Sequence, residues 1–268
     1  MNDIDRKALA SFVAQRMEMG ETEWFFKPQL GAFSGGKRTV PQPATNRPAH
    51  AIPGKPAVFA QQTTAAHNEC VTEDISKESI NVQKTLDDLN TTVCGCMNCA
   101  LGATRTKFVF GSGNPDADIM FVGEAPGRDE DEQGEPFIGR AGKLLTKMIE
   151  AIKLQREDVY IANILKCRPP QNRDPQAGEI EQCEPILIRQ IELIKPAIIC
   201  AVGRIAGQTL LRTKSTLGDM REKIHDYHGV KLMVTYHPAA LLRNPNWKPK
   251  AWDDLKFLRR EYDGMEIV

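Results

Sequence analysis

Cysteines spaced for metal binding are the clearest chemical feature of this 268-residue sequence. Cys96 and Cys99 form a C-x-x-C pair within CGCMNC, and Cys167 and Cys183 follow much later in the chain. A C-x-x-C pair and two later cysteines can supply four thiolates to one metal centre. Cys94 competes with Cys96 as a ligand, but the C-x-x-C spacing favours Cys96. The spacing alone leaves both zinc and a [4Fe–4S] cluster open.

The alternative for Cys167 and Cys183 is that they are small buried apolar residues. This interpretation fits Cys200 well, because it lies inside the apolar run AIICAVG. Cys70 lies in a polar stretch, where we expect a free thiol. The N-terminus has no basic segment followed by an apolar one, so we expect a cytoplasmic protein whose cysteines do not form disulfides.

Polar sequences rich in glycine or proline follow three apolar runs, and they carry the other reactive side chains. They are GEAPG, ANILKCRPP and YHPAALLRNP, which contain Glu124, Asn163 and His237. Their position becomes meaningful once the elements are predicted. The short apolar runs predict strands at 118–122, 159–165, 197–203 and 231–238.

Apolar residues at helical spacing predict helices between and after these strands. The predicted helices cover 144–152, 176–194, a short segment through 210–211, and 248–262; Pro185 predicts a kink or restart in the second. Strands that alternate with helices predict a parallel sheet covered on both faces. Ligands of such sheets bind beyond the carboxyl ends of the strands, where the three polar sequences lie.

The first 80 residues differ in composition from the rest. We predict a short helical segment at 1–26, a disordered linker at 27–80 and a catalytic domain at 81–268. The N-terminal segment is either a marginal amphipathic helix or a motif that docks a protein partner through Trp24, Phe25 and Phe26.

The charge and the apolar content limit the possible partners. The formal net charge is zero, which argues mildly against a nucleic-acid binder, although Lys and Arg can gather on one face. No apolar run is long enough to predict a membrane span. We expect a monomer that binds DNA, for the reason that follows.

Three motifs together resemble those of the family 4 uracil-DNA glycosylases. They are GEAPGRDEDEQGEPFIGRAGKLL (123–145), ANILKCRPPQNRDP (162–175) and HPAALLRNP (237–245), and the similarity runs from about Cys94 to about Asp254. The resemblance implies a three-layer α/β/α fold around a four-stranded parallel sheet. It also implies a structural [4Fe–4S] cluster on Cys96, Cys99, Cys167 and Cys183, and hydrolysis of uracil from DNA at the start of base excision repair.

The resemblance assigns roles in a pocket for an extruded uracil. Phe137 is expected to stack on the base, although a lone Phe is ordinarily a core residue. Asn163 is expected to read the N3–H and O4 edge, and its alternative is a turn residue. His237 is expected to donate to O2 as negative charge develops on the leaving base, whereas a His before Pro is more often structural.

The backbone around Gly123, Glu124 and Ala125 is expected to contact the base as well. The family 1 enzymes carry Asp where this chain has Ala125, so the group that handles the water is open. The nearby candidates are Glu124, Glu130 and Asp131, and we place Glu124 first. Glu130 and Asp131 also suit a solvated acidic loop, RDEDEQGE.

Four side chains are the predicted DNA contacts. Leu242 would fill the gap that a flipped base leaves, and Arg243, Arg168 and Arg173 would bind phosphates. Two other functions stay open: a non-catalytic iron–sulfur module that binds DNA, and a relative that traps abasic sites covalently. The second is disfavoured because KCRPPQNRDP lacks the expected histidine-containing insertion.

Overall fold

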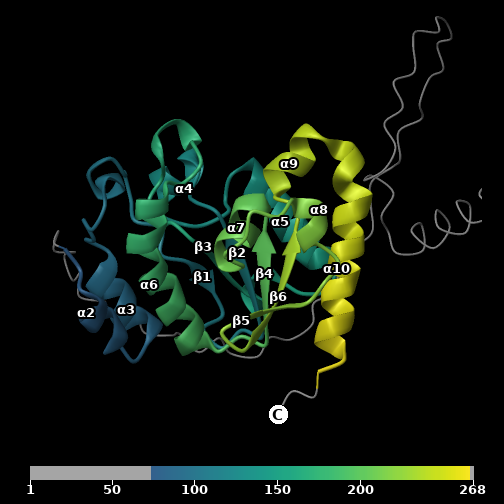
Figure 1. Ribbon diagram of the computed structural model, residues 1–268, viewed down its shortest axis with the longest axis horizontal. Coiled ribbons are helices and arrows are strands. Elements are labelled where there is room, and N and C mark those ends of the chain that lie inside the picture. Colours follow the sequence, from purple (N-terminus) through teal and green to yellow (C-terminus); the bar gives the residue numbers. More distant parts are fainter. Residues whose placement is uncertain (1–73, 266–268) are drawn as a thin grey trace, which may run out of the picture. The chain divides into compact units, whose positions relative to one another are not determined.

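A six-stranded sheet forms the centre of residues 74–265, the part of the chain that the computed structural model describes (Figure 1). In spatial order its strands are β1 (Ser112–Gly113), β3 (Tyr160–Asn163), β2 (Ile119–Gly123), β4 (Ile198–Val202), β6 (Val230–Thr235) and β5 (His225–Tyr227). The four central strands are parallel, as predicted. The sequence pattern did not predict β1 and β5, which pair antiparallel at the two edges.

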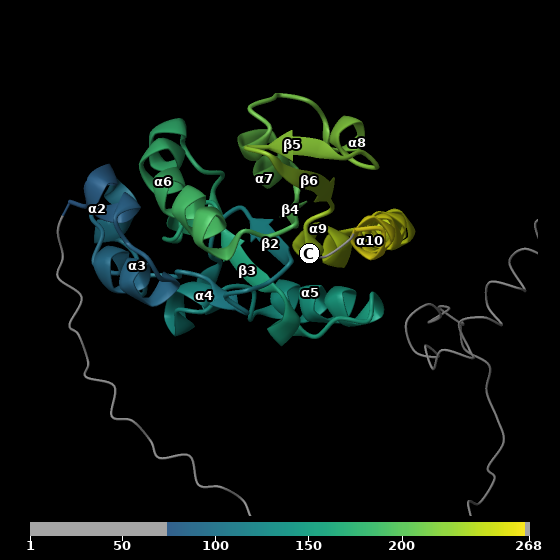
Figure 2. The ribbon, with the colours of Figure 1, turned by 90° about the horizontal axis from the view of Figure 1, so that it is seen from below.

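Helices cover both faces of the sheet, so the predicted three-layer α/β/α architecture is confirmed (Figure 2). One core cluster joins the sheet to α2 (Lys77–Asn81), α3 (Leu86–Val93), α6 (Ala177–Ile194), α7 (Arg204–Leu210) and α8 (Leu217–Met220). The other joins it to α5 (Arg140–Ala151), α9 (Pro238–Arg243) and α10 (Lys248–Asp263). The remaining elements are α4 (Arg128–Gln133) and the 3-10 turns η1 (Ala100–Ala103), η2 (Arg156–Asp158), η3 (Pro170–Asn172) and η4 (Pro245–Trp247).

The strands read as unbroken apolar runs because both of their faces are buried. Successive side chains of a strand point to opposite faces of the sheet. Met120 and Val122 of β2 therefore belong to the first cluster, whereas Ile119 and Phe121 belong to the second. All five residues of β2 are buried.

Two local expectations differ from the structure. Helix α6 is continuous through Pro185, so it does not restart there, which was one of the two predicted alternatives. The acidic segment predicted as a solvated loop is helix α4, and Asp131 in it is only 4% exposed. The Asp131 carboxylate accepts the backbone N–H of Thr106 at 2.9 Å, which explains why this charge is buried.

The domain begins earlier than predicted. Helix α2 starts at Lys77, and Ile75 and Ile80 are both buried in the first core cluster, so residues 74–80 belong to the domain and not to the linker. The predicted helix in 1–26, its aromatic docking motif, most of the linker and Cys70 lie outside the described residues. Within residues 74–265 no helix is long and apolar enough to cross a membrane.

Candidate active site

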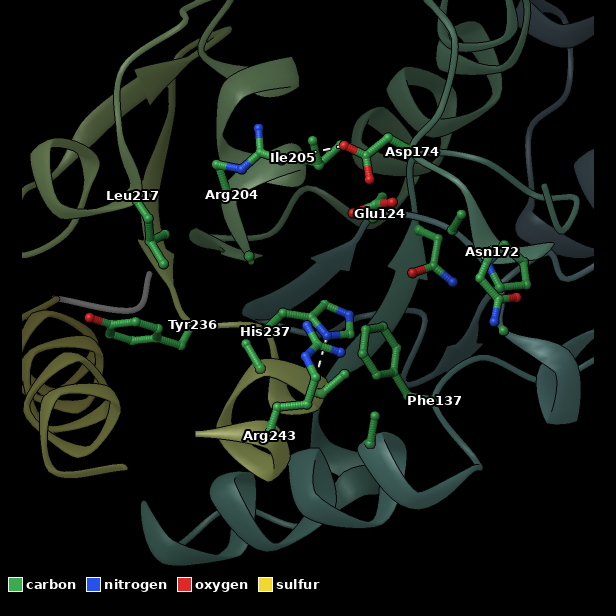
Figure 3. Close-up of a pocket in the computed structure, with 18 of the residues that line it drawn as sticks. Glu124, Phe137, Asn172, Asp174, Arg204, Ile205, Leu217, Tyr236, His237 and Arg243 are labelled. Carbon is green, nitrogen blue, oxygen red and sulfur yellow. Dashed lines mark hydrogen bonds and ion pairs between the residues drawn. The ribbon is translucent and has the colours of Figure 1, made fainter. Parts of the chain in front are cut away.

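A cavity of about 790 Å³ opens at the carboxyl ends of the parallel strands. Its walls include the predicted Glu124, Ala125, Phe137, Asn163 and His237 (Figure 3). Residues from three separate motifs meet here because β2, β3 and β6 run in the same direction and end at one edge of the sheet. We call Phe137, Asn163 and His237 the base pocket.

Gly123 lets two of these side chains approach the strand end closely. It pairs with Asn163 across β2 and β3. A Cβ at this glycine would lie 2.4 Å from Asn163 Oδ1 and 2.5 Å from Cζ of Phe137. Any larger residue would therefore displace both groups, which explains the glycine that opens GEAPG.

Asn163 carries a buried acceptor that no other described residue satisfies. The residue is 2% exposed, and its Oδ1 has no hydrogen-bond partner. A buried acceptor without a partner costs stability, so a ligand donor is the expected complement. The backbone of Asn163 is held firmly, since its carbonyl accepts from Lys166 Nζ at 2.9 Å.

Lys166 is fully buried beneath the pocket, and the sequence analysis did not identify it. Its Nζ also donates to Gln190 Oε1 at 2.6 Å, and Gln190 Nε2 donates to the carbonyl of Phe110 at 3.0 Å. Burial lowers the pKa of Lys166 to about 8. This polar chain ties the strand end that carries Asn163 to helix α6.

Phe137 adopts a backbone conformation that a loop must impose. Its φ is +52°, in the left-handed region that residues other than glycine rarely adopt. The Glu130 carboxylate holds this loop by accepting the N–H groups of Gly127, Ile138 and Gly139 at 3.0–3.1 Å. The Phe137 ring is 6% exposed and lies 5.7 Å from the His237 ring, with the planes 35° apart.

His237 lines the cavity, and burial favours the neutral form of its imidazole. Its Nδ1 accepts the backbone N–H of Ala239 at 3.2 Å, so the proton is on Nε2. Burial, and secondarily the charge of Arg243, lower the pKa of His237 to about 4. The residue caps α9 and lies against Gly203, whose φ of +103° requires glycine.

Among the predicted acids, Glu124 is the one that combines a place in the cavity wall with a raised pKa. Burial, followed by the nearby Asp174, raises the pKa of Glu124 to about 7, while Arg204 opposes the shift. Both oxygens of Glu130 are occupied by backbone donors, and Asp131 is buried away from the cavity with Thr106. These two acids therefore shape the loop.

Four further wall residues were not predicted. Asp174 and Arg204 form an exposed ion pair of 3.3 Å at the rim, and Tyr236 and Trp247 line the side next to α10. Arg204 follows Gly203 at the end of β4, so the strand-end rule that found Asn163 could also have found it. Asp174 lies within the second motif (162–175), where the sequence analysis assigned it no role, and no sequence signal would have indicated Trp247.

A smaller hollow of about 450 Å³ adjoins the cavity, and its lining contains three arginines together with Asp129 and Glu130. Arg128, Arg140 and Arg243 contribute to it, and Leu242 lies on its wall with 44% of its surface exposed. The two hollows share Arg243. An exposed arginine and an exposed apolar side chain beside a pocket suit a DNA phosphate and the space left by an extruded base.

The two other predicted phosphate contacts are already paired. Arg173 donates from both terminal nitrogens to the Glu179 carboxylate, at 2.9 and 2.5 Å. Arg168 donates to Asn172 Oδ1 at 2.8 Å. These pairings order the loop after β3, and phosphate binding by either arginine stays a prediction.

The cysteine region comprises Cys96, Cys99, Cys167 and Cys183, which come from the α3–η1 connection, the loop after β3 and helix α6. All four are free thiols within or against the first core cluster. Burial raises the pKa of Cys167 to about 11, while Arg105 opposes the shift. The charges of Cys99 and Cys96 also raise this pKa, so the sulfurs are near one another. Cys200 is fully buried in the sheet, as expected.

Backbone and side-chain donors point at these sulfurs. The Lys166 N–H lies 3.3 Å from Cys183 Sγ, and Arg105 Nη1 lies 3.5 Å from Cys167 Sγ. Cys94 is disulfide-bonded, contrary to our expectation, which removes it as a rival of Cys96. Within residues 74–265 no three acidic, histidine or cysteine side chains converge closely enough to hold a single metal ion.

Comparison with known proteins agrees with this geometry. The uracil DNA glycosylase superfamily matches residues 110–256. The chain is 46% identical over 181 residues to the type-4 uracil-DNA glycosylase of Archaeoglobus fulgidus, which covers 65% of this chain and 91% of that protein. It is 48% identical over 192 residues to the type-4 enzyme of Saccharolobus solfataricus, a match that covers 68% of this chain and 89% of that protein. It is 45% identical over 151 residues to the type-4 enzyme of Thermotoga maritima, a match that covers 56% of this chain and 79% of that protein. The chain therefore belongs to the type-4 family of the uracil-DNA glycosylase superfamily.

Proposed function

We infer that this protein is a uracil-DNA glycosylase, a hydrolase that breaks the bond between uracil N1 and deoxyribose C1′ in DNA and leaves an abasic site. Family membership supports the reaction, and the orphaned Asn163 Oδ1 is the observation that best supports the base. Uracil offers its N3–H to this acceptor, whereas cytosine presents an acceptor at N3. The pocket therefore favours uracil by leaving the wrong base with a buried mismatch.

The base would lie against Phe137 with its O2 toward His237. As the C1′–N1 bond lengthens, the bonding electrons move onto the uracil ring and negative charge builds on O2. The neutral imidazole donates its Nε2–H to this oxygen, which lowers the energy of the leaving group. A neutral donor suits the reaction because burial and Arg243 would make an imidazolium costly there.

Glu124 would complete the hydrolysis. The water oxygen bonds to C1′ from the face opposite the departing base, and the water proton passes to the Glu124 carboxylate. A pKa of about 7 lets this group accept a proton near neutral pH and release it afterwards. Backbone groups of Gly123, Glu124 and Ala125 border the base at the same strand end.

The same residues support DNA as the partner. We propose that Leu242 fills the space of the extruded nucleotide and that Arg243 binds a flanking phosphate, since both are exposed beside the cavity. Arg168 and Arg173 would shape the loop that meets the strand.

We also propose that the cysteine region holds a [4Fe–4S] cluster. Each thiolate of such a cluster binds a different iron, so the four sulfurs are spaced more widely than around a single zinc ion. Four mutually interacting thiols from three segments of the chain are the ligand set that such a cluster requires. The cluster would connect three segments of chain and supply no step of the hydrolysis.

A single assay separates the candidate functions. Purified protein is incubated with labelled oligonucleotides that contain one uracil, cytosine or thymine, and half of each sample is then heated in alkali. Strand breakage only with uracil and only after alkali is the expected result. Binding without breakage would favour the non-catalytic module, and an adduct that resists denaturant would favour the covalent trap.

The cluster is tested on the same preparation. We expect a brown protein that absorbs visible light at about 400 nm and contains iron and sulfide, as iron–sulfur centres do. Zinc in stoichiometric amount would overturn the cluster assignment and leave the glycosylase assignment standing.

A further inference from the structure

Two exposed apolar side chains follow the base pocket within ten residues of His237. Among the described residues only Val82, Leu242 and Trp247 are large, apolar and exposed, at 67, 44 and 39%. Leu242 lines the smaller hollow, and Trp247 lines the larger cavity. They lie on either side of Arg243, which lines both. Leu242 has a proposed role, whereas nothing in the chemistry above uses Trp247.

Trp247 is held by a column of packed side chains that runs into the core. Its ring lies 5.5 Å from the Tyr236 ring, with the planes 31° apart. The Arg221 guanidinium lies 4.6 Å from the centre of the Tyr236 ring. Arg221 is 5% exposed and donates to both oxygens of the buried Asp254 at 2.8 Å.

Such a column fixes an aromatic ring before any ligand arrives. The Asp254 carboxylate also accepts from Thr235 at 2.6 Å, which anchors the column to the end of β6. Tyr236 is 8% exposed, so Trp247 is the member of the column that meets solvent. A fixed, exposed indole can bind a flat ligand with little loss of side-chain freedom.

The cavity has room for more than one base. Figure 3 shows the rings of Phe137 and Tyr236 on opposite sides of His237. The base pocket occupies the Phe137 side, while Tyr236, Trp247 and Leu217 line the other side of the same cavity. The DNA backbone links the extruded uracil nucleotide directly to its neighbour. The neighbouring base is therefore held close to this side of the cavity.

We propose that Trp247 is a stacking platform for the unpaired nucleobase next to the extruded uracil, so that the enzyme binds two successive bases of a single strand. The proposal rests on the uracil-DNA glycosylase function inferred above. Stacking on an indole needs no particular hydrogen-bonding edge, so the site accepts any neighbouring base. In duplex DNA the neighbouring base stays paired and stacked, so Trp247 matters most on single-stranded substrate.

The test compares two replacements of Trp247 that differ in one property. Trp247→Phe keeps an aromatic face, and Trp247→Leu keeps apolar bulk without one. KM and kcat are measured with single-stranded and duplex uracil oligonucleotides, and Val82→Ala serves as a control for the loss of exposed apolar surface elsewhere. Melting temperatures of all variants check that the fold is retained.

We expect Trp247→Leu to raise KM for single-stranded DNA about tenfold, in line with the loss of one base–aromatic stack. KM for the duplex should change less, kcat should be retained, and Trp247→Phe should stay near the parent protein. Equal KM values for the parent and the Leu variant on single-stranded DNA would overturn the proposal. So would an equal loss in the Phe and Leu variants.

A binding measurement separates this proposal from the function on which it rests. The oligonucleotide carries 2′-fluoro-deoxyuridine, in which the fluorine makes the C1′–N1 bond resistant to cleavage. The fluorescent base 2-aminopurine is placed directly on the 5′ or the 3′ side of this nucleotide. We expect the parent protein to quench 2-aminopurine on one side only and Trp247→Leu to remove that quenching. If the cleavable oligonucleotides released no uracil but quenching was intact, only the glycosylase inference would fail. Uracil release without Trp247-dependent quenching would defeat the platform alone.

Discussion

The base pocket and the cysteine region lie four residues apart on one segment, since Asn163 ends β3 and Cys167 follows it, yet they are built in different ways. The base pocket is preorganised by the ends of parallel strands, and it keeps an unsatisfied acceptor and a neutral imidazole for a ligand. The cysteine region depends on three separate segments that no strand aligns. Its buried thiols have raised pKa values, so they need a positive centre to become thiolates.

The difference teaches where each part obtains its precision. A site at strand ends takes its geometry from the sheet, so it is expected to exist before substrate binds. A site made from loops and a helix takes its geometry from what it binds. Four changes to the chain test this contrast, beginning with the largest expected effect.

Removing either polar member of the base pocket should abolish most catalysis without changing the fold. We expect Asn163→Ala and His237→Ala each to lower the single-turnover rate of uracil release by about 10²–10³, as for the loss of a transition-state hydrogen bond. Asn172→Ala is the matched control, because this amide lines the same cavity but already accepts from Arg168. Rates that are unchanged in both variants would remove the pocket.

Removing one cysteine should act on stability before catalysis. Cys183→Ser is expected to eliminate the visible absorbance and lower the melting temperature by roughly 5–10 °C, since each kcal/mol shifts a domain of this size by about 2–4 °C. Cys200→Ser is the control, because Cys200 is buried even more deeply, at 0% exposed against 9% for Cys183, but lies in the sheet. Equal effects of the two substitutions would mean that Cys183 is only a core residue.

The buried lysine tests whether the two regions are coupled. Lys166→Met keeps the length of the side chain but leaves the Asn163 carbonyl and Gln190 Oε1 without their donor. We expect a loss of about 1–3 kcal/mol in the free energy of unfolding, measured with urea. The uracil-release rate should fall less than in Asn163→Ala. Lys256→Met, at an exposed lysine, should change neither the free energy of unfolding nor the uracil-release rate. If Lys166→Met also changed neither quantity, the two regions would not be coupled through Lys166.

The smallest expected effect is a shift in pH dependence. Because the pKa of Glu124 is raised to about 7, its carboxylate should be lost as the pH falls through 7, and the rate should fall with it. Asp174→Asn removes a neighbouring negative charge, so the acid limb of the pH–rate profile should move to lower pH. Glu124→Gln should abolish that limb. A limb that stays in place in Glu124→Gln would assign the base to another group.

Much of the fold follows from local pattern alone. Each of the four parallel strands is an apolar run buried on both faces, and parallel strands bring their carboxyl ends to one edge whatever the loops do. That rule located Asn163 and His237. It depends only on the common direction of the strands. Elements without such a pattern escaped prediction. Strand β1 has two residues, and α4 has the sequence RDEDEQ, whose helix is held by Glu130 and the buried Asp131.

Residue identity could not decide between chemically equivalent groups, because their roles depend on partners that are distant in sequence. Glu124 and Glu130 are the same residue type in one motif, but three backbone N–H groups occupy Glu130, while Asp174 and burial tune Glu124. Arg173 and Arg243 are both predicted phosphate contacts, but Glu179 already accepts hydrogen bonds from Arg173. The sequence by itself determined the four parallel strands, the edge at which they end and the reactive residue types. Only the tertiary structure, by bringing distant donors and charges together, decided which of those residues are free to act.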